Sequence, residues 1–251
     1  MTDGLGAICD SFYVSSRLYL KLELSPERET VLHFFDRVRK EFPRLTRMRR
    51  RDSSALVLEE EPDDRDARRW LRLDPRTVRM GFFNPPVLDD ARRFNEFVLE
   101  QAPYHLTLSD LDIDHLELSF GFDLQYRGNH DQLVADTLLG DHAGSTFLNG
   151  GHALRVIDAQ PHFGVALSPD CDLQAYVDVR SRTTTFEVRS EGYEAQPITV
   201  LLTLRKYWGI HAPATPVAGL QVLFDRAQQL AREAVVPQFV NPLAAAINSR
   251  P

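Results

Sequence analysis

The stretch FYVSSRLYLKLEL, residues 12–24, decides the fold class of this chain. Apolar and polar residues alternate along it, so that one face carries Phe12, Val14, Leu18, Leu20, Leu22 and Leu24. The other face carries Tyr13, Ser15, Arg17, Tyr19, Lys21 and Glu23. Because successive side chains of a strand point to opposite faces of the sheet, this alternation predicts a strand with one buried and one solvated face.

Strand patterns recur along the rest of the chain. The expected strands span residues 45–50, 55–59, 70–73, 78–83, 116–126, 153–158, 162–168, 173–180, 184–189 and 198–207. Short connections join many of them, which is typical of antiparallel meanders. The inward positions of the strand at 116–126 are Leu116, Leu118, Phe120, Phe122 and Leu124.

Four stretches indicate helices instead. Ser25, Pro26 and Glu27 supply a cap, a proline and an early carboxylate for a helix that ends near Pro43. A second helix has the apolar stripe Ala91, Phe94, Phe97, Val98 and Ala102, and a short third helix is expected at 131–139. Thr215 and Pro216 begin a closing helix, expected to lie across the sheet, with the stripe Leu220, Leu223, Ala227, Leu230 and Ala234.

The order of these elements predicts an α+β fold with a mainly antiparallel sheet. Residues 1–139 have the order of a ferredoxin-like unit, or split βαβ, with extra strands. A glycine-rich connector at 140–152 precedes a β-rich half, 153–251, that is closed by the long amphipathic helix. The pattern leaves open whether these halves are two domains or one continuous domain.

Composition excludes several functional classes. The 251 residues carry a formal net charge of −7, so the average surface repels phosphate backbones and nucleic acid is not an expected partner. No apolar run approaches the roughly 20 residues needed to span a bilayer, so we expect a cytoplasmic protein without a membrane partner. The two cysteines, Cys9 and Cys171, are too few for a disulfide framework or a zinc knuckle.

The sharpest chemical motif is His105-Leu106-Thr107-Leu108. On a strand, His105 and Thr107 would point to one face. This arrangement resembles half of the active site of the two-histidine phosphoesterases, in which His-x-Thr/Ser occurs twice and the histidines act as acid and base. The second copy is missing, because the segments after His115 and His162 have Glu117 and Gly164 at the third place. The resemblance implies, as an alternative function, a phosphoester hydrolase that uses His105 and Thr107 with another histidine from residues 115–162.

Histidines and arginines supply two further candidate sites. His142, His152 and His162 could hold a divalent metal, but they lack the tight spacing of ligand pairs, so solvated loop histidines are the favoured interpretation and no cofactor is expected. The arginine cluster within residues 44–51, with Arg47, Arg49 and Arg50 as candidate ligand-binding residues, would suit RNA binding or processing. Acidic residues at 59–64 favour a different outcome, a hairpin in which opposite charges face each other.

No complete catalytic constellation occurs in the sequence. We therefore favour a non-catalytic protein that binds a protein or small-molecule partner or assembles with itself as a homo-oligomer. A phosphoester hydrolase and an RNA-binding protein remain the alternatives.

Overall fold

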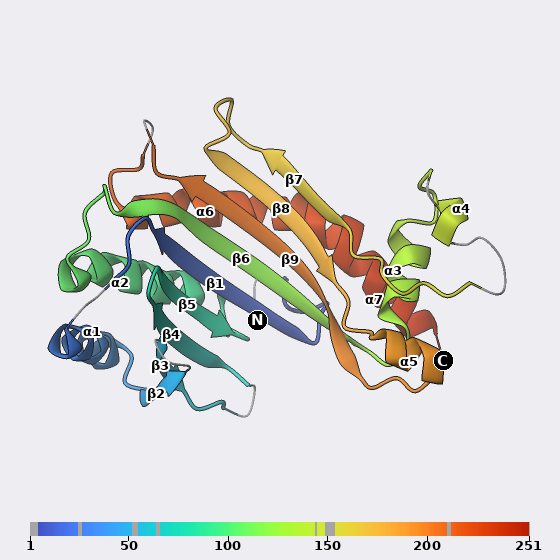
Figure 1. Cartoon of the computed structure of the whole chain (residues 1–251), viewed down its shortest axis with the longest axis horizontal. Helices are drawn as coiled ribbons and strands as arrows, with labels where there is room; N and C mark the ends of the chain where they lie inside the picture. Colours follow the sequence, from blue (N-terminus) through green and yellow to red (C-terminus); the bar gives the residue numbers. More distant parts are fainter. Residues whose placement is uncertain are drawn as a thin grey trace.

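Nine strands form one antiparallel sheet in the computed structural model of the chain, and helices cover one of its two faces (Figure 1). The structure describes residues 5–24, 27–51, 55–63, 66–143, 145–148, 154–209 and 212–250. The strand order is β2-β3-β4-β5-β1-β6-β9-β8-β7, and each pair of neighbours is antiparallel. The predicted α+β class with an antiparallel sheet is confirmed.

The strands from both halves of the chain belong to the same sheet. Their bounds are β1 Ser11–Leu20, β2 Leu45–Arg51, β3 Ala55–Glu60, β4 Arg68–Asp74, β5 Thr77–Phe83, β6 Ile113–Tyr126, β7 His162–Ala166, β8 Leu173–Arg180 and β9 Gln196–Tyr207. Strands β2 to β5 form the predicted meander, and β1 lies between β5 and β6. The pairing of β6 with β9 joins the two halves of the sheet.

The helices that pack on the sheet lie behind it in Figure 1. The helical bounds are α1 Arg28–Glu41, α2 Leu88–Leu106, α3 His130–Leu138, α4 Ser145–Leu148, α5 Thr185–Ser190, α6 Pro216–Leu230, the π-helical η1 Ala231–Val240 and α7 Asn241–Ser249. Helix α2 contacts β5 and β1, while α6 contacts β6 and β9. Because α6, η1 and α7 follow one another without a break, they form the predicted long C-terminal helix across the sheet.

The core lies between the sheet and these helices. The inward residues predicted for β6 are all buried, and so are Leu220, Leu223 and Ala227 of α6. Thr215 caps α6 as predicted, because its side chain accepts a hydrogen bond from the Ala218 N–H. Strand β1 ends at Leu20, so the predicted inward residue Leu22 is instead 69% exposed.

Three further local predictions were wrong. Residues 184–189 form α5 and not a strand, because Thr184 and Glu187 make a reciprocal capping box that starts a helix. The described part of the expected strand at 153–158 has no strand structure. His105 lies in the last turn of α2, which ends at Leu106 and not before the histidine. The predicted cap residues Ser25 and Pro26 lie outside the described ranges.

No helix in the described part of the chain is long and apolar enough to cross a bilayer.

Candidate ligand-binding site

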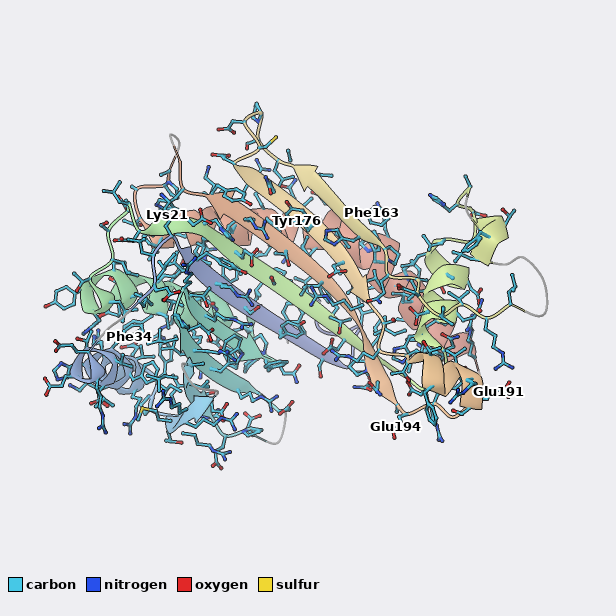
Figure 2. All side chains as sticks on the ribbon, in the orientation of Figure 1. Lys21, Phe34, Phe163, Tyr176, Glu191 and Glu194 are labelled. Atoms are coloured by element: carbon cyan, nitrogen blue, oxygen red, sulfur yellow. The ribbon has the colours of Figure 1, made fainter. Side chains whose placement is uncertain are left out.

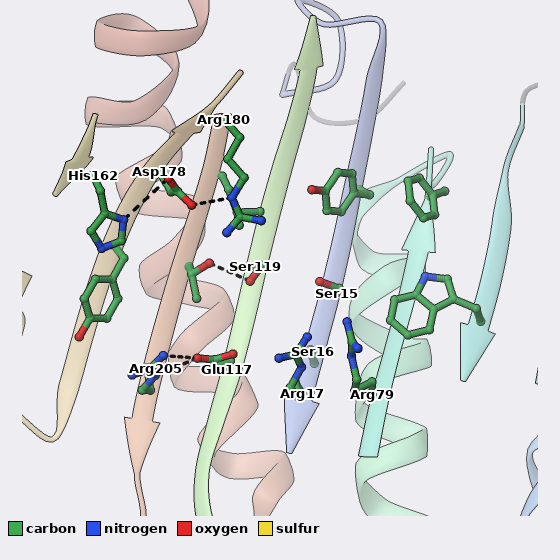
Figure 3. Close-up of a pocket in the computed structure, with 16 residues that line it drawn as sticks. Ser15, Ser16, Arg17, Arg79, Glu117, Ser119, His162, Asp178, Arg180 and Arg205 are labelled. Atoms are coloured by element: carbon green, nitrogen blue, oxygen red, sulfur yellow. Dashed lines mark hydrogen bonds and ion pairs between the residues drawn. The ribbon is translucent and has the colours of Figure 1, made fainter. Parts of the chain in front are cut away.

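The face of the sheet opposite the helices, called the open face below, carries a hollow of about 610 Å³ (Figure 3). This central hollow draws residues from seven strands, β4, β5, β1, β6, β9, β8 and β7. Its volume falls within the range of roughly 300–1,000 Å³ that is usual for small-molecule sites. The antiparallel registers arrange its lining residues in rows that run across the strands.

The middle row forms the floor of the central hollow. Read across the sheet, it contains Trp70, Gly81, Ser15, Ser119, Thr203 and Tyr176. The Ser119 and Thr203 hydroxyls are hydrogen-bonded to each other at 2.9 Å. The small side chains in the middle of the row leave space above the sheet, and an aromatic residue stands at each end. The result is a hydroxyl-bearing floor between two aromatic walls.

Glycines opposite the aromatic residues let the rings lie on the sheet. A Cβ atom at Gly81 would lie 2.8 Å from three atoms of the Trp70 ring. In the same way, a Cβ atom at Gly164 would lie 2.7 Å from the Tyr176 ring. Since real Cβ contacts are longer than this, both rings need a glycine in the paired strand. The glycines therefore set the orientation of the two aromatic walls.

A charged row borders the floor on one side. In register order it contains Arg72, Arg79, Arg17, Glu117 and Arg205. Arg17 and Arg79 are direct cross-strand partners, and like charges in that position repel. Burial, followed by the positive charge of Arg17, lowers the pKa of Arg79, while the negative charge of Asp74 acts in the opposite direction.

Arg17 and Arg79 lack the carboxylate partners that the other arginines of this row have. Arg72 makes an ion pair with Asp74, and Arg205 makes one with Glu117. Among the residues that the structure describes, no carboxylate forms an ion pair with Arg17 or Arg79. Their contacts are the Tyr19 hydroxyl for Arg17 and the Trp70 ring, 6.0 Å away, for Arg79.

Glu117 and Arg205 form a firm ion pair at the same border. The Arg205 Nε donates to Glu117 Oε1 at 2.8 Å. Burial by itself would raise the pKa of Glu117, but the neighbouring His115 and Arg205 lower it to about 2. Glu117 therefore stays ionised and neutralises Arg205, which leaves the cationic side of the central hollow to Arg17 and Arg79.

The opposite border is less charged. It contains Phe83, Tyr13, Leu201, Asp178 and His162. Burial, reinforced by the negative charge of Asp123, raises the pKa of Tyr13 to about 12, so its phenol stays protonated and can donate a hydrogen bond. Asp178 forms an ion pair with Arg180, with 2.6 Å between Arg180 Nε and Asp178 Oδ2. Its other carboxylate oxygen, Oδ1, lies 3.8 Å from His162 Nδ1.

The residues proposed for phosphoesterase chemistry lie elsewhere. Because His105 lies in the last turn of α2 and Thr107 follows that helix with a left-handed φ of 55°, the two residues do not share a strand face. The His105 ring lies 5.9 Å from Phe34, and burial, followed by the charges of Arg37 and His33, lowers its pKa. The expected second histidine from residues 115–162 is not among these neighbours.

The arginine cluster forms the predicted hairpin. Arg47 lies opposite Glu59 in the β2–β3 register. Arg49 makes an ion pair with Glu59 at 2.9 Å, and Arg47 makes one with Glu61 at 3.6 Å. Arg50 also has an interaction partner. Arg47 and Arg49 line a second hollow of about 520 Å³, which shares Trp70, Arg79 and Phe83 with the central hollow.

The candidate metal residues do not form a cluster in the described ranges. His162 lines the central hollow and His142 is exposed after α3, while His152 lies outside the described residues. Over the part of the chain that the structure describes, no group of three His, Cys, Asp or Glu side chains could hold a metal ion.

Sequence reasoning missed the residues that build the central hollow. Arg17 and Ser15 were assigned to the solvated face of their strand, and the structure places both on the open face. Two signals were present: the polar face of residues 12–24 carries two tyrosines and an arginine beside its lysine and glutamate, and glycines interrupt the strands. A glycine within a strand often marks close approach by another group.

No family model matches this chain, and no curated protein matches it significantly.

Proposed function

We propose that this protein binds a small organic anion with a flat ring in the central hollow, without transforming it. The observation that carries the proposal is the cross-strand pair of Arg17 and Arg79, two cations that form no ion pair with a carboxylate among the described residues. An anion between them would replace repulsion by attraction. The chemistry of the floor and walls then indicates what the rest of the ligand is like.

The charged end of the ligand would be a carboxylate, phosphate or sulfonate. Guanidinium groups provide fixed, planar arrays of donors that match the oxygen atoms of these groups. The Ser15 hydroxyl lies beside Arg17 and Arg79 in the adjoining row and adds a neutral donor. Since the site is half-buried, these interactions are stronger there than on a fully solvated surface.

The uncharged part of the ligand would be a flat ring. Trp70 and Tyr176 offer aromatic surfaces at the two ends of the floor, and aromatic rings favour stacked or edge-on neighbours. Arg79 lies next to Trp70, so a ligand whose anionic group is attached directly to its ring can reach both residues. A saturated ring of similar size would lose most of the stacking.

Calorimetric titration with three probes tests this proposal. Naphthoate combines the anion with the flat ring, naphthylmethanol keeps the ring without the charge, and cyclohexanecarboxylate keeps the charge without the flat ring. We expect naphthoate to bind most tightly of the three. In Arg79→Gln its affinity should fall by about tenfold or more, since a hydrogen bond to a charged group contributes roughly 1.5–3 kcal/mol.

The same variant provides a second readout that does not depend on the choice of probe. Without ligand, Arg79→Gln should raise the free energy of unfolding by about 0.2–1 kcal/mol, because it removes the repulsion from Arg17. Arg39→Gln is the matched control, since Arg39 is an exposed arginine on α1 that pairs with Asp36. It should leave naphthoate binding unchanged.

Three results would contradict the proposal. The first is equal binding of naphthoate and naphthylmethanol. The second is an affinity for naphthoate that Arg79→Gln does not change. The third is displacement of naphthoate by a single-stranded RNA oligonucleotide at physiological salt, which would assign the open face to nucleic acid.

We also propose that the N-terminal half is a ferredoxin-like unit with two added strands. The connections support this description, since α1 links β1 to β2 and α2 links β5 to β6, with β1 between β5 and β6. The four neighbouring strands β4, β5, β1 and β6 have the ferredoxin-like order, and β2 and β3 are the additions. They extend the open face beyond β4, the strand whose Trp70 lines the central hollow.

A further inference from the structure

The two edge strands of the sheet differ in how they are protected. Strand β2, with the sequence LTRMRRR, lines one edge with arginines. Strand β7, with the sequence HFGVA, forms the other edge, and all five of its residues are exposed. Charged side chains on an edge strand discourage pairing with another chain, whereas an apolar edge invites it. Only β7 has the composition of an edge that accepts another strand.

The hydrogen bonds next to β7 show which of its backbone groups face outward. The Val179 N–H donates to the Pro161 carbonyl, and the Leu167 N–H donates to the Leu173 carbonyl. In an antiparallel pair, hydrogen-bonded positions alternate with positions whose backbone groups point away from the partner. The odd-numbered residues of β7 therefore bond to β8. The even-numbered residues, His162, Gly164 and Ala166, direct their N–H and C=O groups outward.

We propose that two copies of this chain form a symmetric dimer by antiparallel pairing of their β7 strands. The twofold axis passes beside Gly164, so that Gly164 pairs with its own copy and His162 pairs with Ala166 of the other chain. These are the residues whose backbone groups face outward, so each of the three positions gains hydrogen bonds. Pairing of this kind would join the two nine-stranded sheets edge to edge.

The side chains of β7 are complementary to themselves in this register. Phe163 of one copy lies opposite Val165 of the other, and the two residues are 52% and 57% exposed in the single chain. They occupy a position without cross-strand hydrogen bonds, where opposing side chains come closest. Phe239 of η1, with its ring 6.2 Å from that of Phe163, extends the apolar contact. No pair of like charges meets along the strand.

The central position also leaves room for the second copy. Gly164 has no side chain, and the Tyr176 ring of its own chain already covers its open face. Symmetric self-pairing of β2 would instead gather arginines of both copies at one edge. The proposed partner for the β7 edge is therefore a second copy of this chain.

Sedimentation velocity on the full chain tests the dimer. The wild type should sediment with twice the chain mass of 28.6 kDa. Ala166→Pro removes an outward N–H without affecting the bonds to β8, and Val165→Lys places a charge opposite Phe163, so both variants should sediment as monomers. The matched control is Met48→Lys on β2, where Met48 has a similar exposure of 54%. It should remain dimeric.

A cross-link tests the register. Paired residues in hydrogen-bonded positions have Cα atoms about 5.5 Å apart, which suits a disulfide. His162→Cys combined with Ala166→Cys, in a chain whose native Cys9 and Cys171 are replaced by alanine and serine, should give a covalent dimer on mild oxidation. His162→Cys alone should not, because the two copies of residue 162 lie four residues out of register.

If the wild type sediments as a monomer at high protein concentration, the proposal is wrong. The β7 edge would then be a candidate site for a strand from another protein. A dimer that persists in Ala166→Pro, or that Met48→Lys dissociates, would also overturn the proposal. Melting curves of the variants separate loss of pairing from loss of folding. If Val165→Lys unfolds, Ala166→Pro and the cross-link still decide the result.

Discussion

The two faces of the sheet are built from the same strands but follow different rules. On β6, the helix-covered face carries Leu116, Leu118, Phe120 and Phe122, all fully buried. The open face of the same strand carries His115, Glu117, Ser119 and Gly121. Figure 2 shows the side chains of the chain with the open face of the sheet toward the viewer. The covered face is a core, whereas the open face is a set of chemical groups arranged by register.

This difference between a packed core and a face of paired polar groups means that the two faces should respond differently to substitutions. A core accepts apolar residues of suitable volume, because its stability comes from burial and packing. On the open face each residue has a particular neighbour across the strand, as Arg17 has Arg79 and Trp70 has Gly81. Substitutions should therefore cost stability on the covered face and alter binding on the open face.

The largest loss of stability should come from the covered face. Leu223 of α6 is completely buried against the sheet, so Leu223→Ala removes packing and leaves a cavity. We expect the free energy of unfolding, measured by urea melts, to fall by about 2–5 kcal/mol. A loss below about 1 kcal/mol would mean that this face is not the core.

A smaller and pH-dependent effect is expected at Glu117 on the open face. Its folded pKa of about 2 lies below the ordinary value of 4.5, so the carboxylate stabilises the fold above pH 4.5. This contribution is lost as the pH falls through about 2. At neutral pH, Glu117→Gln should lower the free energy of unfolding by about 1.5–3 kcal/mol, the range for a hydrogen bond to a charged group.

Melts of both proteins from pH 7 down to pH 2 check this expectation. The difference in free energy of unfolding between wild type and Glu117→Gln should become smaller as the pH falls. Glu41→Gln is the control, because Glu41 pairs at the surface with Arg93, whose side chain is 71% exposed. If the difference in free energy of unfolding stays constant over the whole pH range, the ion pair between Glu117 and Arg205 does not stabilise the fold.

The smallest effect is expected at the edge of the open face. Arg47 and Arg49 are 53% and 52% exposed and pair with glutamates of the same hairpin region. Replacing each with alanine should change stability by roughly 0–1 kcal/mol, as for other exposed ion pairs. RNA should bind weakly at physiological salt. Submicromolar, salt-sensitive RNA binding that the double variant abolishes would show instead that these arginines are free to bind phosphates.

The sequence predicted the strands best where alternation was strong, and failed where local signals competed. Residues 184–189 contain β-branched residues that favour a strand, yet the capping box at Thr184 and Glu187 starts a helix. The motif from His105 to Leu108 was likewise interpreted as part of a strand. Proline is tolerated in the last turn of α2, and the burial of Leu106 extends that helix past His105.

The sequence by itself determined the α+β class, most of the strands, the long closing helix and which face of each main strand is apolar. These features follow from the spacing of apolar residues along one segment. The tertiary structure alone decided that Arg17 meets Arg79, that Ser119 meets Thr203 and that Trp70 lies on Gly81. Such pairs depend on strand order and register, which arise from packing between segments far apart in the chain. The candidate site could therefore be recognised only after the strands were placed side by side.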